Sequence, residues 1–301
     1  MRMERKNMRK IQVAVILFFI VSCICYGVYS LLEWKQADHN TPVISIEEDV
    51  LLVKASASEE ELLAGVTAQD AEDGDLTDRV QIASMTPLIN GQERTIQYIV
   101  FDSADQLATA TRKIIYEDYT SPKIYLQEPL RFTVDDFTQE IIDLAYTAED
   151  VIDGDLTNKM HISYDLVNQT MYAEIYGTSI EPGEYTITFQ VNNSAGDTCI
   201  LPLTMTLVEK EDSAEKAYPV LSDYVVYTKV GRKVDVMKYP VGLNRMGRNY
   251  LFEELGNVSV KDIEIQSHVN YEEAGIYTVE YTFTMAGGEA AATTLYVVVE
   301  D

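Results

Sequence analysis

The chain has 301 residues and a formal net charge of −26 at pH 7. At roughly 150 residues per domain, this length predicts two or three modest domains. A composition of 47% hydrophobic and 24% charged residues excludes wholesale disorder. The acidity argues against nucleic-acid binding, because phosphate contacts need clustered lysine and arginine. Three cysteines are too few for a disulfide framework.

The first element along the chain is an apolar segment from Ile11 to Leu32, which holds 22 residues without a charge. It exceeds the roughly 20 residues that a helix needs to span a bilayer. The ten residues before it carry five basic side chains and one acid, Glu4, whereas 18 basic and 48 acidic residues follow them. The positive-inside rule therefore predicts a cytoplasmic N-terminus and an extracellular bulk in a single-pass protein of the cell membrane. We predict a cytoplasmic tail at 1–10, a transmembrane anchor at 11–32 and a tether at 33–41.

Two alternatives remain for this apolar segment, namely lipidation and cleavage. The stretch Ile20-Val21-Ser22-Cys23 resembles a bacterial lipobox, in which Cys23 would carry the lipid. The residues that follow Cys23 stay apolar as far as Leu32, whereas mature lipoproteins usually begin with a polar tether. A cleaved signal peptide would have a shorter apolar core and a small-residue cleavage site. All three interpretations place the bulk of the chain outside the cell.

The rest of the chain contains an internal repeat with an offset of 80 residues. Residues 66–80 and 146–160 match at eight of 15 positions, and both contain the run Asp-Gly-Asp-Leu-Thr. Each copy follows an X-Pro step, at Pro42 and Pro122, and a fainter third copy without that run begins near Pro219. The repeats predict three tandem domains, at 42–118, 119–210 and 217–301. The short linker Glu117–Ser121 predicts a stiff first pair, and the longer charged linker Glu209–Ala217 predicts a swinging third domain.

Each repeat closes on two strand-like segments that meet in a short turn. β-Branched and aromatic residues fill Thr95–Phe101, Tyr185–Val191 and Tyr277–Phe283, and a second β-rich run such as Thr294–Val299 follows the turn. This arrangement is typical of hairpins and predicts antiparallel sandwiches. Short acidic stretches predict helical turns at Glu59–Leu63, Asp136–Leu144 and Tyr250–Leu255.

The pattern Thr-Ala-x-Asp-x-x-Asp-Gly-Asp-Leu-Thr, followed by Gly-x-Tyr-Thr and an Asn/Asp-Ser-Ala turn, resembles a family of bacterial immunoglobulin-like repeats on surface proteins. The resemblance covers most of residues 42–301, although Arg94-Thr95-Ile96 replaces Gly-x-Tyr-Thr in the first repeat. It implies an all-β fold with three tandem immunoglobulin-like β-sandwich domains after one N-terminal transmembrane helix. The family serves as stalk, spacer or binding module and has no common catalytic residues to transfer.

The acidic loops of the first two repeats are candidate calcium sites. Carboxylates at this density suit Ca²⁺, which takes 6–8 oxygen ligands. The alternative is a plain turn, in which Asp-Gly provides the left-handed residue, aspartates form Asx turns and the leucine anchors the loop. The candidate ligands are Asp70, Glu72, Asp73, Asp75, Asp150, Asp153 and Asp155.

A basic stretch in the third repeat is the candidate ligand-binding surface. Only Asp235 opposes six basic residues there, and tyrosines border or interrupt the run. In an acidic ectodomain, such a stretch can dock an anionic wall polymer, a phosphate-bearing glycan or an acidic partner. The alternatives are a solvated strand face and a contact with the acidic repeats of the same molecule. The six residues are Lys229, Arg232, Lys233, Lys238, Arg245 and Arg248.

The sequence lacks the H-E-x-x-H, G-x-S-x-G and G-x-x-x-x-G-K motifs. We therefore predict a non-enzymatic bacterial cell-surface protein that displays immunoglobulin-like domains for adhesion or for binding a cell-wall polymer, a glycan or another envelope protein. We expect no cofactor apart from the candidate calcium, and no nucleic-acid partner. The alternative function is a structural spacer or an accessory subunit of a membrane-bound envelope complex.

Overall fold

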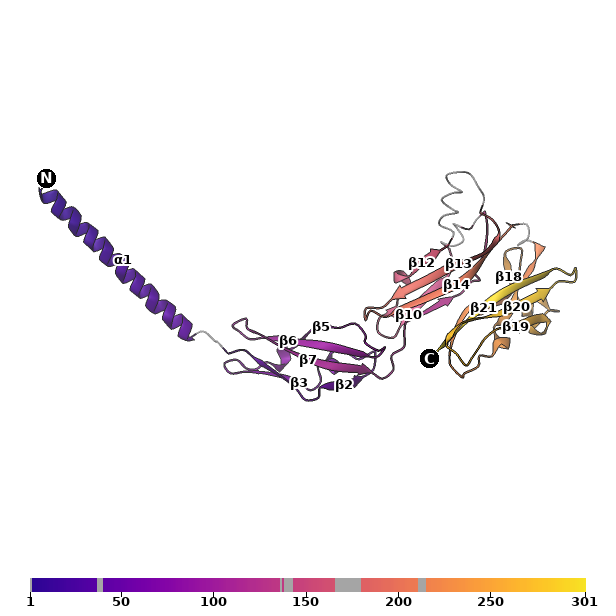
Figure 1. Ribbon diagram of the computed structural model, residues 1–301, viewed down its shortest axis with the longest axis horizontal. Coiled ribbons are helices and arrows are strands. Elements are labelled where there is room, and N and C mark those ends of the chain that lie inside the picture. The colour runs from indigo at the N-terminus through magenta and orange to yellow at the C-terminus, as the bar shows by residue number, and fades with distance from the viewer. Residues whose placement is uncertain (1, 37–39, 136, 138–142, 166–179, 211–214) are drawn as a thin grey trace. The chain divides into compact units, whose positions relative to one another are not determined.

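The computed structural model describes residues 2–36, 40–135, 137, 143–165, 180–210 and 215–301. Its first element, α1 (Arg2–Gln36), contains the segment Gln12–Leu31 with a mean hydropathy of 2.3 (Figure 1). This segment is long and apolar enough to cross a membrane, and no part of it is buried against the rest of the protein. The predicted apolar helix is thus confirmed, while its retention and orientation stay predictions.

The first repeat contains a three-stranded sheet of order β1-β3-β4 and a four-stranded sheet of order β2-β7-β6-β5. Side chains alternate along β6, where Ile96, Tyr98 and Val100 are buried in the core. The Tyr98 hydroxyl donates a hydrogen bond to the Leu62 carbonyl 2.7 Å away. The bounds are β1 (Val43–Ile46), β2 (Val50–Val53), α2 (Glu59–Leu63), β3 (Val66–Asp70), β4 (Gly74–Asp75), β5 (Gln81–Met85), β6 (Glu93–Phe101) and β7 (Leu107–Tyr116).

The second repeat has the same plan, with sheets of order β11-β10-β8 and β12-β13-β14-β9. Its core alternates in the same way, because Ile187, Phe189 and Val191 are buried along β13. The bounds are β8 (Lys123–Leu126), β9 (Arg131–Thr133), β10 (Tyr146–Asp150), β11 (Gly154–Asp155), β12 (His161–Tyr164), β13 (Gly183–Asn192) and β14 (Thr198–Val208).

The third repeat has sheets of order β15-β17-β18 and β16-β21-β20-β19. The bounds are β15 (Ala217–Leu221), β16 (Val225–Lys229), β17 (Pro240–Arg245), β18 (Arg248–Leu251), α6 (Phe252–Leu255), β19 (Ile263–Ser267), β20 (Gly275–Thr284) and β21 (Ala290–Glu300). All three repeats end in a long antiparallel hairpin, namely β6–β7, β13–β14 and β20–β21. The predicted all-β fold and its closing hairpins are therefore confirmed, as are the short helices α2 and α6. The helical turn predicted at Asp136–Leu144 lies largely outside the described residues.

The prediction of purely antiparallel sandwiches is wrong for one strand pair in each of the last two repeats. β9 pairs with β14 in parallel, and β16 pairs with β21 in parallel. In both repeats the first strand (β8 or β15) belongs to the smaller sheet. The next strand (β9 or β16) belongs to the larger sheet, where it lies beside the last strand of the repeat (β14 or β21). A parallel pair needs a long connection, and the intervening strands of the repeat provide it. The alternation of side chains alone does not reveal this crossover.

The structure divides into two compact units. One contains Met1–Val53, Ala57–Thr86 and Glu93–Ile115, and the other contains Lys54–Ser56, Pro87–Gln92 and Tyr116–Asp301. The second and third repeats therefore belong to one unit, and this grouping does not fit the predicted swing of the third domain. The predicted linker between them lies partly outside the described residues, and the proposed domain boundaries stay predictions.

The second and third repeats share one continuous hydrophobic core, which includes Phe189 from one repeat and Tyr281 from the other. Polar contacts reinforce this interface, since the Tyr296 hydroxyl donates to the Thr204 carbonyl. Lys123 Nζ lies 3.4 Å from Glu300 Oε2. Burial of apolar surface across the interface explains why a longer linker does not separate the two repeats.

Candidate functional site

The acidic loops of the first two repeats form nearly identical turns. Asp70 Oδ1 accepts hydrogen bonds from the backbone N–H groups of Glu72 and Asp73 at 2.8 and 3.0 Å. Asp150 Oδ1 accepts the corresponding two bonds in the second repeat at 2.9 and 3.0 Å. Gly74 and Gly154, with φ of 77° and 72°, occupy the left-handed region that glycine tolerates without a steric penalty. These are the Asx turns that the turn interpretation predicts.

The leucine of each loop anchors it to the core, as Leu76 and Leu156 are both buried. Asp75 and Asp155 each accept the backbone N–H of the threonine two residues on. Within the described residues, no group of three or more His, Cys, Asp or Glu side chains is arranged to hold a metal ion. The geometry favours the turn interpretation for the loops as a whole, and calcium binding stays a prediction.

The loop carboxylates predict a loss of stability in acid. Burial raises the pKa of Asp153, but hydrogen bonds from Ser194 and the contact with Lys159 outweigh burial and leave that pKa below its usual value of 3.8. Hydrogen bonds from Thr77 and Thr157 likewise lower the pKa values of Asp75 and Asp155. A carboxylate with a lowered pKa in the folded state stabilises the fold at neutral pH, and this contribution disappears as the pH falls below 3.8.

We therefore expect a lower urea midpoint at pH 3 than at pH 7, measured in the presence of chelator. Asp153→Asn should lower the midpoint at pH 7 and reduce the difference between the two pH values. An unchanged pH dependence in that variant would contradict the assignment.

Two of the predicted basic residues lie at the closed end of one hairpin. Arg245 and Arg248 are Cα partners where β17 turns into β18. The Arg248 guanidinium lies 4.9 Å from the Tyr250 ring centroid, and Arg245 Nη2 lies 3.9 Å from the Met285 sulfur. Both arginines are exposed.

The other four predicted basic residues belong to different elements. Lys229 ends β16 opposite Glu300, and Arg232 and Lys233 lie in the loop that follows. Lys238 ends a short 3-10 helix, with its Nζ 5.1 Å from the Tyr239 ring centroid. The six residues thus lie on several different elements of the third repeat rather than on the face of one strand.

The three cysteines lie in two different environments. Cys23 and Cys25 are exposed on α1, where lipidation of Cys23 stays an alternative to the anchor. Cys199 lies on β14, and its burial raises the pKa of the thiol to about 11. A thiol with a raised pKa is a poor nucleophile at neutral pH. The interpretation of Cys199 as a structural residue is consistent with this environment.

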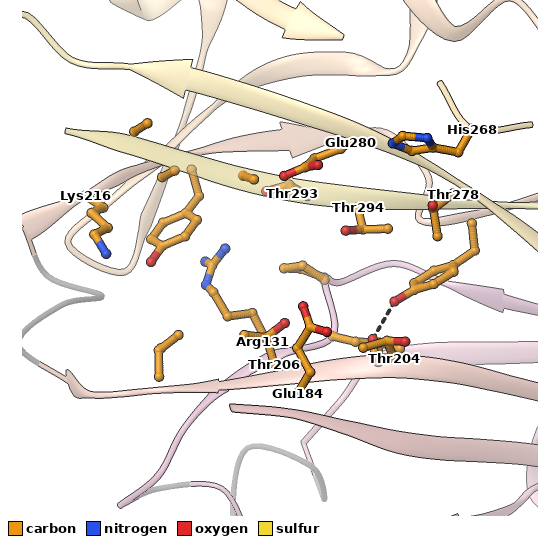
Figure 2. Close-up of a pocket in the computed structure, with 18 residues that line it drawn as sticks. Arg131, Glu184, Thr204, Thr206, Lys216, His268, Thr278, Glu280, Thr293 and Thr294 are labelled. Atoms are coloured by element: carbon orange, nitrogen blue, oxygen red, sulfur yellow. Dashed lines mark hydrogen bonds between the residues drawn. The ribbon is translucent and has the colours of Figure 1, made fainter. Parts of the chain in front are cut away.

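A cleft of about 520 Å³ opens between the second and third repeats. Figure 2 shows Glu184 and Thr206 on one side and Glu280 and Thr294 on the other, with Arg131 reaching between them. Glu184 and Thr206 are Cα partners on β13 and β14, and Glu280 and Thr294 are Cα partners on β20 and β21. Each side of the cleft thus presents a carboxylate that is paired with a threonine on the neighbouring strand.

The sheet pattern explains why polar side chains line this cleft. Along β14, Leu203, Met205 and Leu207 are buried, so Thr204 and Thr206 point to the opposite face. Without the third repeat, this face would be an ordinary solvated sheet surface. The packing of β20 and β21 beside it turns the solvated face into one wall of a cleft.

Positive charge and aromatic surface complete the cleft. The Arg131 guanidinium stacks over the Tyr218 ring, 3.4 Å from its centroid. Lys216 and His268 lie at opposite ends of the cleft in Figure 2. Thr293 Oγ1 is buried and has no hydrogen-bond partner among the described residues. The lining can therefore both donate and accept hydrogen bonds, as a ligand rich in hydroxyl groups requires.

None of the predicted site residues lines this cleft. The Thr-x-Thr alternation on β14 could have indicated a polar sheet face, but such faces are common on solvated strands. No sequence motif marks the charged residues of the cleft, which are Arg131, Lys216, Glu184 and Glu280. They lie together only because the third repeat packs beside the second.

No family model and no curated protein sequence matches the chain. Among solved structures, the CBM51-2 domain with GlcNAc and the INT domains of ZmpB from Clostridium perfringens are 17% identical, with a TM-score of 0.21 over 55% of this chain and 41% of that one. The lipoprotein BT2262 from Bacteroides thetaiotaomicron is 10% identical, with a TM-score of 0.20 over 85% and 98% of the two chains. The protocadherin GammaB4 extracellular domain is 10% identical, with a TM-score of 0.18 over 87% and 50%.

The chain thus spans less than half the length of the Clostridium chain that it matches.

Proposed function

We propose that this protein is a membrane-anchored cell-surface binding protein whose ligand is a glycan or a glycan-containing wall polymer. The apolar helix Gln12–Leu31 supports the anchor, and the five basic residues before it support a cytoplasmic N-terminus. The resemblance to bacterial immunoglobulin-like repeats supports a bacterial surface location. Its role in this proposal is binding and not catalysis.

The choice of a glycan as the ligand rests on the polar cleft between the second and third repeats. A saccharide presents many hydroxyl groups on a compact ring, and each hydroxyl both donates and accepts. Glu184 and Glu280 can accept from such hydroxyls, Arg131 can donate to them, and the threonines can do either. An anionic substituent on the polymer would be drawn to Arg131 and Lys216.

Binding of the full-length protein in detergent micelles to purified, fractionated wall glycans tests this proposal. We expect Glu184→Ala with Thr206→Val, and separately Glu280→Ala with Thr294→Val, to weaken binding by about tenfold each. That factor corresponds to the net loss of one or two hydrogen bonds.

Thr186→Val provides the matched control, because Thr186 is exposed on the same strand as Glu184 but does not line the cleft. Equal loss in the control, or full binding in both double variants, would contradict the assignment to the cleft. Reversal of Arg245 and Arg248 to glutamate tests the basic stretch in the same assay.

A structural spacer is the second candidate function, and the shared core of the second and third repeats favours it. A continuous core holds two repeats in one fixed arrangement, as a spacer requires. Capture of one membrane protein, with no wall glycan bound, would support this alternative over the first.

A further inference from the structure

The first repeat contains two buried carboxylate oxygens without a hydrogen-bond partner among the described residues, namely Oδ2 of Asp70 and Oδ2 of Asp102. Asp70 is 9% exposed and Asp102 is 1% exposed. An unpaired charge in a site shielded from water is costly. A buried atom of this kind therefore requires an explanation.

The second repeat shows where these two atoms point. Asn193 occupies the position of Asp102, at the start of the turn of the closing hairpin. There, Asn193 Nδ2 donates to Asp150 Oδ2 at 3.1 Å, in a buried hydrogen bond. Asp150 is the counterpart of Asp70. The Asn193 amide therefore donates a hydrogen bond to Asp150 Oδ2, whereas the corresponding atom of the first repeat, Asp70 Oδ2, has no partner among the described residues.

The two turns also share a second hydrogen bond, although Asn193 Nδ2 has an additional partner in the Tyr119 hydroxyl, 2.9 Å away. Asp102 Oδ1 accepts the Gln106 N–H at 2.7 Å, and Asn193 Oδ1 accepts the Asp197 N–H at 2.9 Å. The remaining atom of each side chain, Oδ2 of Asp102 or Nδ2 of Asn193, must therefore face the same way. From this correspondence we infer that Asp70 Oδ2 and Asp102 Oδ2 face each other in the first repeat, as Asp150 Oδ2 and Asn193 Nδ2 do in the second.

The connection between loop and turn is also the same in both repeats. The Asp73 carboxylate accepts the Ser103 N–H and Oγ–H at 2.5 and 2.8 Å, and the Asp153 carboxylate accepts the same two groups of Ser194 at 2.7 and 2.5 Å.

Arg79 contacts this turn, but its guanidinium binds other atoms than the two Oδ2 atoms. Arg79 Nη2 donates to the Asp102 carbonyl at 3.4 Å, and Arg79 Nη1 lies 3.8 Å from Asp73 Oδ2. Neither contact reaches an Oδ2 atom of the pair.

We propose that the first repeat binds a divalent cation between Asp70 Oδ2 and Asp102 Oδ2, whereas the second repeat uses the Asn193 amide in place of the cation. Calcium takes 6–8 oxygen ligands, of which Asp70 and Asp102 would provide two hard carboxylate oxygens. Asn193 Nδ2 and Asp150 Oδ2 are 3.1 Å apart in the second repeat. If the two carboxylate oxygens of the first repeat have the same separation, a calcium ion between them can contact both at the usual calcium–oxygen distance of ~2.4 Å. The site differs from the loop-only sites predicted from the sequence, because its second ligand comes from the hairpin turn and only one repeat contains it.

Exchange of the two residues tests this proposal in the full-length protein. We expect millimolar calcium, compared with chelator, to raise the melting temperature of the transition that contains the first repeat by about 5 °C or more. Asp102→Asn copies the second repeat and should abolish this rise, and Asn193→Asp should create a calcium-dependent rise in the second repeat. Hydrogen exchange of peptides covering 66–80 and 146–160 assigns each effect to its repeat.

Asp105→Asn is the matched control, because Asp105 is exposed in the same turn and its replacement should leave the calcium effect intact. The proposal is overturned if calcium leaves the melting temperature and the exchange of the wild type unchanged, as a proton shared by the pair would predict. It is also overturned if Asp102→Asn folds and keeps the whole calcium effect.

Discussion

Replacement of Tyr227 by phenylalanine is expected to destabilise the contact between the second and third repeats by about 2–4 kcal/mol, since each buried backbone group left without a partner costs about 1–3 kcal/mol. The Tyr227 hydroxyl donates to the Ile124 carbonyl at 3.0 Å and accepts the Ile124 N–H at 2.9 Å. Ile124 lies opposite Ala148 on the neighbouring strand. The backbone groups of Ala148 are already bonded elsewhere, because its N–H donates to the Thr157 hydroxyl and its carbonyl accepts the Leu156 N–H. One phenol oxygen thus satisfies both backbone groups of Ile124.

Urea unfolding of the full-length protein measures this loss. Burial raises the pKa of Tyr227 far above neutrality, so the hydroxyl keeps its proton throughout the experiment. Tyr125→Phe is the matched control, because the Tyr125 hydroxyl donates to Glu149 at an exposed site, 3.0 Å away. We expect the control to cost less than about 1 kcal/mol, as for other solvent-exposed hydrogen bonds. Equal losses in the two variants would show that the hydroxyl of Tyr227 does not join the repeats.

Replacement of Phe189 by alanine is expected to cost about 3–5 kcal/mol in the free energy of unfolding, from lost burial and from the cavity left behind. The side chain is fully buried on β13 and packs edge-on against the Tyr146 ring, with the centroids 6.3 Å apart. Phe189 belongs to the core that continues into the third repeat. The urea midpoint of both repeats should therefore fall together.

Phe101→Ala provides the control of matched chemistry, since Phe101 ends β6 with 45% of its surface exposed. We expect that change to cost clearly less than Phe189→Ala, because Phe101 keeps 45% of its surface in water and its truncation leaves no enclosed cavity. A comparable loss in both variants, or a loss confined to the second repeat, would contradict the shared core.

The acidic loops show which structural features can be predicted from the local sequence. Asp-Gly-Asp-Leu-Thr predicts a left-handed glycine, Asx turns and an anchoring leucine, and the structure confirms each of them at Gly74 and Leu76. These features depend on bonds within a few residues, so the sequence contains what is needed. The role of Asp102 escaped prediction because its partner Asp70 lies 32 positions away in the chain, in a different strand.

The strands themselves were predictable for a related reason. The alternation of apolar and polar residues records which face of a sheet is buried, and short turns mark where a hairpin reverses. Thr95–Phe101, Tyr185–Val191 and Tyr277–Phe283 all lie within strands of the structure. The parallel pairs β9–β14 and β16–β21 were missed, since alternation does not specify which neighbour a strand joins.

The sequence by itself determined an apolar helix, an all-β fold with three long closing hairpins, and the turn chemistry of the acidic loops, because periodicity and local hydrogen bonding act over short distances. Only the tertiary structure decided that the second and third repeats share a core, and that Glu184 and Arg131 face Glu280 across one cleft. The spread of the basic residues from Lys229 to Arg248 over separate elements was also decided there. Such arrangements depend on apolar surface buried between segments far apart in the chain, and no local pattern encodes which surfaces meet.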